Sequence, residues 1–499
     1  MTAAAIAFGV AAMAAVAATP PVRALARRIG AYDHALCSRK VHGRPVPRLG
    51  GAGMVGAFLA AVGAAAVADR TVLLSLSAEP AVAAGLLAGA LVIAALGIYD
   101  DLRGADAKLK FTVQFAVAGA MYALGFRIEQ VAHPFGAPLE LGLLGLPVTM
   151  LWIAGVVNAM NLVDGLDGLA AGIALVAAFA LAAVSALTGD VLVLVVAVAL
   201  AGAALGFLFF NFDRASIFMG DTGSMFLGFV LATAAIRPDP AAPGTVALVV
   251  PVLALGVPLA DTLLAMGRRA LRGVPMFRAD RGHIHHRLLD LGLTQRQTVL
   301  VLYGVSALLA AAGVVLAFAS AARAVVVLLA IGALGVVALR RLGFFQFAKT
   351  RRVLQARRRN LEMQGHVRRA SQALREADTL EEVWFALRFA AWGLGAAAVA
   401  LRLPLPRALA APSFTHGFEE RRKLLVARFG LDPERPGDAH LELGFDDGRL
   451  EIDRDTEIAV EILCASTSDA LARVGRPTRA GLRLVDGMRQ SGTHRSAGL

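Results

Sequence analysis

Long apolar runs separated by short polar segments make up the first two thirds of the chain. Ala, Leu, Val and Gly dominate these runs, and many approach the roughly 20 residues with which a helix crosses a bilayer. The pattern predicts an all-α polytopic membrane protein with about 11 transmembrane helices. The predicted spans are Ala3–Val22, Gly51–Ala68, Val82–Tyr99, Phe111–Phe126, Leu143–Val157, Leu169–Leu187, Val191–Phe210, Met225–Ile236, Val246–Met266, Val299–Phe318 and Ala324–Leu339.

The overall composition supports this class. Of the 499 residues, 57% are hydrophobic and 17% are charged, which excludes an ordinary soluble globular protein. The two cysteines, Cys37 and Cys464, are too far apart along the chain to suggest a disulfide framework or a metal motif. The first apolar run has no basic stretch before it, so we expect a retained span rather than a cleaved signal.

Basic residues are concentrated in every second loop between the predicted spans. Because Lys and Arg accumulate on the cytoplasmic side, the N-terminus is predicted outside and everything after Leu339 inside. Orientation and contact with anionic membrane lipid then explain the net charge of +12. We expect no nucleic-acid partner, since no basic stretch carries interleaved aromatic residues. All unusual polar clusters fall on the predicted cytoplasmic face.

The first cytoplasmic loop is cationic and ends in the constrained run Pro45-Val-Pro-Arg48-Leu-Gly-Gly. Such a loop, stiffened by Pro and Gly, is suited to hold an anion at the membrane surface. The alternative is that its charges only report orientation. The side chains predicted to hold this anion are Arg39, Lys40, His42 and Arg48, together with Lys108 after the third predicted span, and the family resemblance given below implies that the anion is a lipid phosphate.

Two adjacent carboxylates, Asp100 and Asp101, close the third predicted span. The C-terminal end of a helix already carries partial negative charge, so two acids there are costly unless a cation or a proton transfer uses them. A pair of acids also suits general-base chemistry. The alternative is a solvated acidic end that Lys108 and Lys110 neutralise.

A polar segment, Asn158-Ala-Met-Asn161-Leu-Val-Asp164-Gly-Leu-Asp167-Gly, interrupts a long apolar stretch in the middle of the chain. At helical spacing its amide and acid side chains share one face. Oxygen-bearing side chains of this kind suit a hard cation such as Mg²⁺, which shares its ligands with phosphates. The alternative is a polar turn between helices, capped by Asn and Asp.

Two later cytoplasmic segments also carry candidate chemistry. Gly220-Asp221-Thr-Gly-Ser opens a predicted helix, where Asp221 is either a plain N-cap or a metal ligand that meets a diphosphate. The last long loop contains Asp280-Arg-Gly-His283-Ile-His285-His286-Arg287. Zinc is disfavoured there, because no Cys or second histidine pair accompanies the cluster, and hydrogen bonding to a diphosphate is favoured.

In this order and with these spans between them, the five segments resemble the polyprenyl-phosphate N-acetylhexosamine-1-phosphate transferase family (glycosyltransferase family 4). The resemblance covers about Ile29 to Leu339 and rests on Asp-Asp with Lys-Leu-Lys-Phe, on the Asn- and Asp-rich segment, and on Phe-Met-Gly-Asp-x-Gly-Ser. The ending His-Ile-His-His-Arg is similar to the branch that uses a simple UDP-N-acetylhexosamine. The muramoyl-pentapeptide branch typically has three consecutive histidines after Pro-Ile.

The resemblance implies transfer of a sugar 1-phosphate, most simply GlcNAc 1-phosphate, from a UDP-sugar to undecaprenyl phosphate, with release of UMP. It implies a bacterial inner-membrane enzyme with a cytoplasmic site, acting at the lipid-linked first step of cell-surface polysaccharide synthesis. Direct in-line attack by the lipid phosphate is favoured, with a covalent aspartyl intermediate as the alternative. The chemistry fits a metal and several cations that bring two anionic phosphates together.

The family's functional residues map onto matching positions of this chain. Mg²⁺, or Mn²⁺, would be held by Asn161 and Asp221. Asp100 and Asp101 would deprotonate or position the lipid phosphate. The four catalytic candidates are Asp100, Asp101, Asp164 and Asp167, and the nucleotide-sugar contacts are assigned to Asn158, Asp164, Asp167, His283, His285, His286 and Arg287.

Composition changes abruptly after Arg340. Residues 1–340 form the predicted membrane domain, and 341–375 a basic juxtamembrane helix that either binds anionic lipid or is a solvated linker. Residues 376–480 are predicted to form a small cytoplasmic α+β domain, distantly similar to a GAF fold, and 481–499 a disordered tail. The expected strands are Ala397–Leu401, Leu424–Phe429, His440–Phe445 and Arg449–Ile452, the last two joined as a hairpin.

Two other classes of function remain open at this stage. The first is the same chemistry on a different UDP-sugar, such as a 6-deoxy-HexNAc or UDP-MurNAc-pentapeptide. The second is a non-catalytic membrane scaffold or receptor, which the several oxygen-bearing side chains at the membrane face disfavour. A homodimer, and a protein or ligand partner for the C-terminal domain, are further possibilities.

Overall fold

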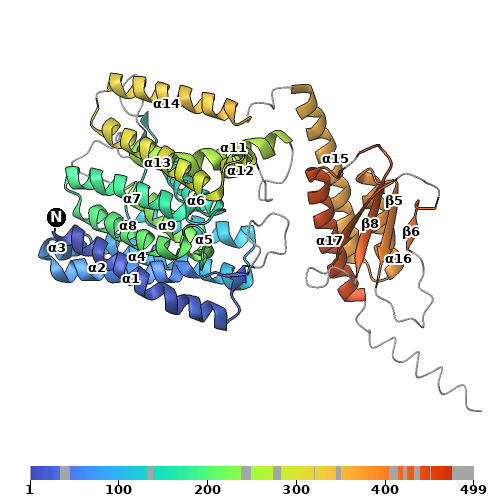
Figure 1. Cartoon of the computed structure of the whole chain (residues 1–499), viewed down its shortest axis with the longest axis horizontal. Coiled ribbons are helices and arrows are strands. Elements are labelled where there is room, and N and C mark those ends of the chain that lie inside the picture. The colour runs from blue at the N-terminus through green and yellow to red at the C-terminus, as the bar shows by residue number, and fades with distance from the viewer. Residues whose placement is uncertain are drawn as a thin grey trace, which may run out of the picture. The chain divides into compact units, whose positions relative to one another are not determined.

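The computed structural model describes residues 2–33, 45–131, 139–237, 249–272, 282–319, 321–343, 350–403, 414–419, 424–431, 439–449 and 451–474. The chain divides into two compact units. The first comprises Met1–Arg268 and Phe277–Gln346, and the second comprises Arg269–Met276 and Phe347–Leu499. Figure 1 colours them from blue to yellow and from orange to red.

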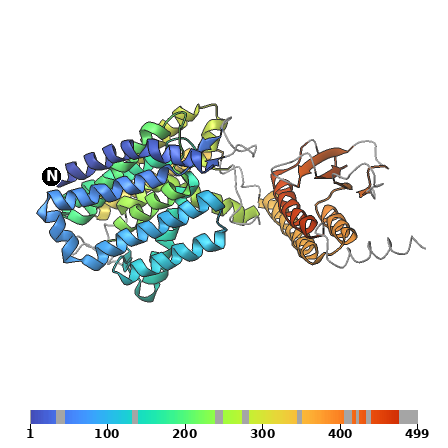
Figure 2. The same ribbon diagram turned by 90° about the horizontal axis from the view of Figure 1, so that it is seen from below.

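Helices build the first unit, and they run nearly side by side (Figures 1 and 2). Two short antiparallel strand pairs occur in the connections between helices. β1 (Tyr32–Asp33) pairs with β2 (Val46–Pro47), and β3 (Gln130–Val131) pairs with β4 (Leu139–Glu140). The helices are α1 (Thr2–Arg28), α2 (Gly50–Ala68), α3 (Arg70–Ala78), α4 (Pro80–Arg103), α5 (Ala107–Ala123), α6 (Gly145–Val163), α7 (Leu169–Thr188), α8 (Val191–Asn211), α9 (Gly220–Ala234), α10 (Val249–Ala254), α11 (Gly256–Arg272), α12 (Ile284–Asp290), α13 (Gln295–Ala317) and α14 (Ala321–Arg341).

Eight helical segments in the described part of the chain are long and apolar enough to cross a membrane. They contain α1, α2, α4, α6, α7, α8, α13 and α14, and each coincides with a predicted span. The other three predicted spans coincide with shorter helices. These are α5 with 17 residues, α9 with 15 residues, and the pair α10 and α11, which are separate helices. The chain is a multi-pass membrane protein, and the count of eleven spans stays a prediction.

Small residues let these helices approach one another closely. A Cβ at Gly202 of α8 would lie 2.3 Å from the carbonyl oxygen of Phe8, and one at Gly206 would lie 2.4 Å from that of Ala12. The two glycines are four residues apart, so they present one slim face to α1. Close backbone packing replaces the hydrophobic effect as the source of helix association inside a bilayer.

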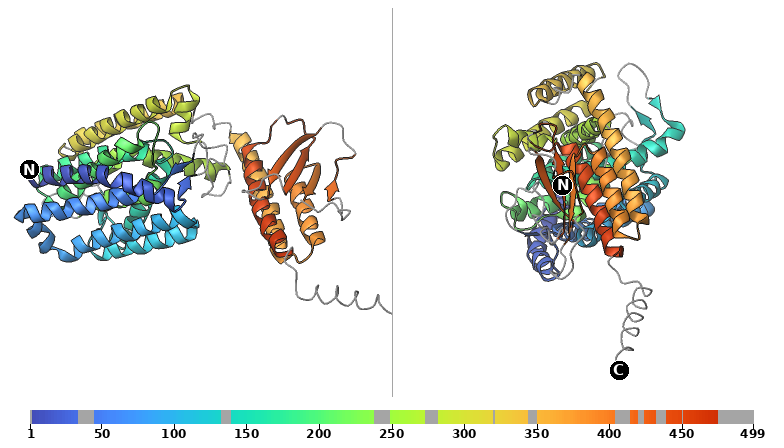
Figure 3. Two further views of the ribbon diagram at one scale, coloured as in Figure 1. Left: turned by 60° about the horizontal axis from the view of Figure 1, so that its bottom comes forward. Right: turned by 90° about the vertical axis from the view of Figure 1, so that its right-hand side faces the viewer.

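The second unit packs helices α15 (Thr350–Glu376), α16 (Leu380–Gly393) and α17 (Arg454–Val474) with a four-stranded antiparallel sheet (Figure 3). The strand order is β6 (Thr415–His416), β5 (Ala398–Arg402), β8 (His440–Phe445) and β7 (Leu425–Gly430). Thr379 caps α16 in a capping box with Glu382. Three of the expected strands are present, as β5, β7 and β8, within a residue or two of their predicted bounds.

Two features of this unit differ from expectation. The stretch expected as a basic juxtamembrane helix is helical, as α15, but its Met363, Val367 and Leu374 are buried in the core of the second unit. No strand occurs among the described residues after β8, so the expected hairpin is wrong. Instead Arg449 folds back onto Asp447, with its Nε 2.7 Å from Oδ1 of that residue, and lies over the Phe445 ring.

Candidate active site

The N-terminus of α9 is capped by a side chain from α4, 120 residues away along the chain. The carboxylate of Asp101 accepts the backbone N–H of Asp221 at 3.0 Å and that of Thr222 at 3.1 Å, together with the Thr222 hydroxyl at 2.7 Å. These contacts satisfy N–H groups that have no partner inside the helix. Asp101 is only 2% exposed, so its carboxylate is committed to this cap.

Glycine is required where α4 meets α9. Gly220 has a positive φ of 69°, and a Cβ there would lie 2.3 Å from Oδ2 of Asp101. A Cβ at Gly97 of α4 would lie 2.4 Å from the Cα of Thr222. Both positions bring the capping carboxylate directly against the helix end that carries Asp221.

The constrained end of the first loop packs against the same helix end. Gly50 donates its N–H to the carbonyl oxygen of Phe218, and Gly51 donates to that of Met219, both at 2.9 Å. A Cβ at Gly51 would lie 2.1 Å from the backbone nitrogen of Gly223. The two consecutive glycines are therefore explained by close backbone packing beside Asp221.

A lysine ammonium joins the two carboxylates that remain at this junction. Lys110, in the first turn of α5, forms an ion pair with Asp100, and its Nζ lies 2.6 Å from Oδ2 of Asp221. Asp100 also accepts the N–H of Ala105 at 2.5 Å, which fixes it at the end of α4. Three elements thus converge on one cation between two acids.

The amides of α6 take two different directions. Asn161 donates to the Ser224 hydroxyl at 3.0 Å and interacts electrostatically with the Asp221 carboxylate, so it belongs to the cluster at the start of α9. Asn158 donates to the buried Gln114 of α5 at 2.6 Å and therefore joins two helices. We call Asp100, Asp101 and Asp221 the acidic cluster. The structure brings Asn161, but not Asn158, directly to it.

The acids that follow α6 also differ in their surroundings. Asp167 is 6% exposed and accepts the N–H of Ala215 at 2.9 Å. Next to it, Gly168 donates to Asn211 at 2.9 Å and accepts the Tyr303 hydroxyl at 2.5 Å. These bonds tie the loop to the end of α8 and to α13, so Asp167 lies where it stabilises the loop.

Asp164 lies just beyond the end of α6 and is half-buried. Burial raises the pKa of its carboxyl well above the usual value, and the negative charges of Asp221, Asp101 and Asp167 raise it further. The Asp164 carboxyl is therefore subject to the negative charge of these three carboxylates. An acid in such a position can hold a proton that its neighbours cannot.

The histidine segment is held by an acid that sequence reasoning missed. Asp261 of α11 is 3% exposed, and its Oδ2 lies 2.9 Å from Nδ1 of His283. Its Oδ1 accepts the N–H of Ile284 at 2.8 Å, at the start of α12. Asp261 therefore orients His283 and fixes the helix that carries His285, His286 and Arg287. An acid inside a predicted span was a signal for such a role.

His285 connects this segment to the loop after α6. A Cβ at Gly165 would lie 2.9 Å from its Nε2, so only glycine leaves room for the ring. Its ring stacks on His283 with centroids 5.6 Å apart. Burial and then the neighbouring His286 lower the pKa of His285 to about 3, so the imidazole is neutral at physiological pH.

The predicted lipid-phosphate residues are only partly described. Arg39, Lys40 and His42 lie outside the described residues. Arg48 is half-buried beside the glycines that contact α9, and Lys108 is exposed at the start of α5. The roles assigned to all of these side chains stay predictions.

Comparisons with known proteins agree with this geometry. A model of glycosyl transferase family 4 matches residues 83–239, which contain Asp100, Asp101, Lys110, Asn161 and Asp221. A relative from Bacillus subtilis (strain 168), described as a probable undecaprenyl-phosphate N-acetylglucosaminyl 1-phosphate transferase, is 37% identical over 312 residues, which are 62% of this chain and 84% of the relative. The chain belongs to glycosyl transferase family 4.

Two further relatives carry similar descriptions. A decaprenyl-phosphate N-acetylglucosaminephosphotransferase of Mycobacterium tuberculosis (strain CDC 1551 / Oshkosh) is 41% identical over 313 residues, 57% of this chain and 76% of the relative. An undecaprenyl-phosphate alpha-N-acetylglucosaminyl 1-phosphate transferase of Escherichia coli (strain K12) is 31% identical over 239 residues, 46% of this chain and 64% of the relative. The family resemblance expected from the motifs is confirmed.

Proposed function

We propose that this protein transfers GlcNAc 1-phosphate from UDP-GlcNAc to a polyprenyl phosphate, undecaprenyl phosphate in the first instance, and releases UMP. The observation that carries the proposal is the convergence of Asp100, Lys110 and Asp221 at one helix junction. Family membership and the relatives' descriptions support the substrates.

The acidic cluster fits a divalent cation. Asp100 and Asp221 already share a cation, the Lys110 ammonium, and Asn161 adds an amide beside Asp221. Among the described residues no three His, Cys, Asp or Glu side chains converge as a metal cluster. Mg²⁺ commonly takes one or two carboxylates and completes its shell with phosphate oxygens and water. Asp221 and Asn161, joined by Asp100, would hold it, and bound there it would neutralise phosphate charge.

The chain's own residues supply positioning. An oxygen of the lipid phosphate attacks the sugar-bearing phosphorus of the UDP-sugar, and the bond from that phosphorus to the UMP oxygen breaks. Two anions must meet, so cations and well-placed donors matter more than covalent machinery. Asp100 is placed to orient the lipid phosphate through Lys110, while Asp101 acts on Asp221 through the helix cap.

The nucleotide side of the site is assigned to the histidine segment. The neutral His285 ring lies against Gly165, which follows Asp164 in the sequence. Helix α12 and the loop after α6 are therefore in contact at this point. Arg287 is half-buried on α12 and offers a guanidinium to a diphosphate. We assign His283, His286 and Arg287 to the phosphates of the leaving nucleotide.

The test is an assay of purified protein with undecaprenyl phosphate and a panel of radiolabelled UDP-sugars. UDP-GlcNAc should be the preferred donor, and Asp221→Asn should abolish Mg²⁺-dependent transfer in a folded protein. Asp69→Asn is the matched control, because the Asp69 side chain caps the start of α3 by accepting the N–H of Thr71. Near-normal turnover by the Asp221 variant would refute the assignment of the acidic cluster.

We also propose that the acidic cluster faces the cytoplasm of the bacterial inner membrane, which is the side where UDP-sugars are made available. The support is the accumulation of basic residues in the loops on that side. In a background with Cys37→Ser and Cys464→Ser, Ser77→Cys should react with an impermeant thiol reagent applied from outside. Arg296→Cys should react only after the membrane is opened. The opposite pattern would reverse the orientation.

A further inference from the structure

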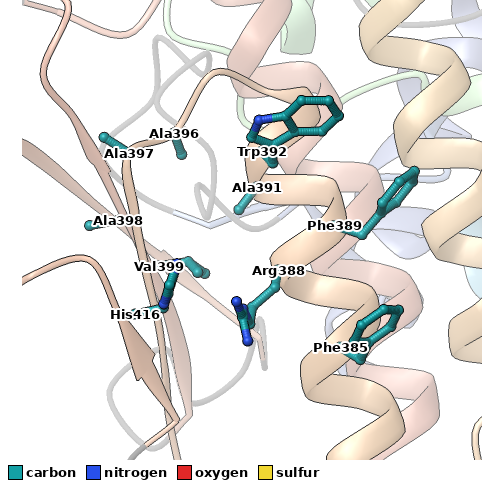
Figure 4. Close-up of a pocket in the computed structure, with 10 residues that line it drawn as sticks. All are labelled: Phe385, Arg388, Phe389, Ala391, Trp392, Ala396, Ala397, Ala398, Val399 and His416. Carbon is teal, nitrogen blue, oxygen red and sulfur yellow. The ribbon is translucent and has the colours of Figure 1, made fainter.

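A cavity of about 480 Å³ opens in the second unit between α16 and the edge of the sheet formed by β5 and β6 (Figure 4). Its floor consists of small side chains, including Ala397 and Val399. A volume of this size lies within the range of small-molecule sites in proteins, which are about 300–1,000 Å³. All residues that line the cavity belong to the second unit, whereas Asp221 belongs to the first.

Two nitrogen-bearing side chains face each other across the cavity. Arg388 reaches from α16 toward His416 and Val399 on the strands (Figure 4). Among the described residues that line the cavity none is acidic, and no described carboxylate pairs with Arg388. An unpaired guanidinium over an apolar floor attracts a carboxylate or a phosphate group, because its planar fork matches two acceptor oxygens.

Aromatic side chains form the wall on α16. Phe385 is 73% exposed and Trp392 is 72% exposed, which is unusual for large apolar rings. The ring of His366 on α15 packs edge-on against the Trp392 ring, with the ring centroids 5.6 Å apart. The same histidine ring lies 5.2 Å from that of Phe389. His366 therefore contacts two of the three aromatic rings of the wall, those of Trp392 and Phe389.

We propose that this cavity binds a small amphiphilic organic acid, with an apolar or aromatic body against Trp392 and Phe385 and one acidic group on Arg388 and His416. A nucleotide fits less well, since the lining offers few polar side chains for a ribose. A bilayer surface fits less well too, because Arg388 faces the strands across the hollow.

The test uses full-length protein in phosphatidylcholine nanodiscs and phenylbutyrate as the probe. Trp392 is one of three tryptophans in the chain, so its fluorescence reports occupancy. We expect a saturable change in tryptophan fluorescence with phenylbutyrate, and none with phenylbutylamine, which has the same body and the opposite charge. The signal should vanish in Trp392→Phe.

Variants separate the anion contact from the apolar one. Arg388→Gln should weaken phenylbutyrate binding about tenfold or more, in keeping with the loss of a charge-assisted hydrogen bond. Ala396→Phe, which fills the cavity, should abolish it. Arg375→Gln, on the exposed face of α15 and outside the lining, should bind as the unaltered protein does.

Two outcomes would overturn the proposal. Equal binding by Arg388→Gln and Arg375→Gln would show that the acid is not recognised in the cavity. Loss of the phenylbutyrate signal in nanodiscs that contain phosphatidylglycerol, with the Trp392 change already present, would show that this face docks on anionic lipid instead. Because the readout is binding, the result is independent of transferase activity.

Discussion

The carboxylate of Asp101 accepts the backbone N–H of Asp221 at 3.0 Å, so one acid of the predicted pair holds the helix that carries another predicted site residue. Asp100, its neighbour in sequence, instead pairs with Lys110. The two adjacent acids at the end of α4 therefore do different work. Asp101 fixes the start of α9, and Asp100 faces the Lys110 ammonium.

Replacing Asp101 with Ala should lower kcat about a hundredfold, since displacement of Asp221 by even about 1 Å disturbs the reacting geometry. It should also destabilise the fold by about 1–2 kcal/mol through the lost cap. The control is Asp69→Ala, which removes the cap of α3 and should cost stability without the loss of rate. Initial rates and thermal unfolding, measured on the same preparations, check both effects. A rate loss no larger than that of the control would contradict the positioning role.

Lys110 occupies the place between two carboxylates where a divalent cation would bind. Replacing it with Gln removes a competing positive charge, so Mn²⁺ should bind about tenfold more tightly, which corresponds to about 1.4 kcal/mol. Electron paramagnetic resonance of free Mn²⁺ measures this directly. Lys108→Gln alters an exposed lysine two residues earlier and should leave Mn²⁺ affinity unchanged. Unaltered or weaker Mn²⁺ binding by Lys110→Gln would place the metal elsewhere.

Asp261 orients His283 and starts α12. Asp261→Asn should raise KM for the UDP-sugar about tenfold and leave KM for the lipid phosphate unchanged, because we assign the histidine segment to the nucleotide side. Asp290→Asn, an exposed acid at the end of the same helix, is the control. Equal changes in both KM values would indicate a general loss of structure instead.

His285 makes the fold sensitive to acid. Its folded-state pKa of about 3 lies below the ordinary histidine value of 6.5, so the unfolded chain binds more protons between these two values. The contribution of His285 to the free energy of unfolding is fully present above pH 6.5. It falls as the pH drops from 6.5 toward 3, by at most about 1.4 kcal/mol per pH unit. Thermal unfolding at a series of pH values should show a shallower decline in His285→Gln than in the unaltered protein. His286→Gln removes one of the two main causes of the lowered pKa of His285, so it should give an intermediate decline.

The second unit should be dispensable for transfer. All residues of the acidic cluster and the histidine segment belong to the first unit. A chain that ends at Gln346 should therefore keep Mg²⁺-dependent activity in detergent. The truncation point precedes α15 because the apolar side chains of this helix are buried in the second unit. Rates of the short and full-length forms at equal folded concentration check this. A folded but inactive short form would assign part of the site to the second unit.

The local sequence was sufficient for the membrane class, for eight of the spans and for the family. Length of apolar run and spacing of acids and amides are properties of neighbouring residues, so periodicity reports them directly. The same holds for the capping box of α16 and for strands β5, β7 and β8, which rest on local propensity.

Only the tertiary structure decided which acid meets which partner. Asp101 with Asp221 and Asp261 with His283 are contacts between residues 120 and 22 positions apart, set by how α4, α9 and α11 pack. An acid at the end of a helix has the same local sequence whether it faces a substrate, a cation or the bare N–H groups of another helix. Packing through Gly97, Gly220 and Gly51 brings these groups within hydrogen-bonding distance, and that selects the role of each carboxylate.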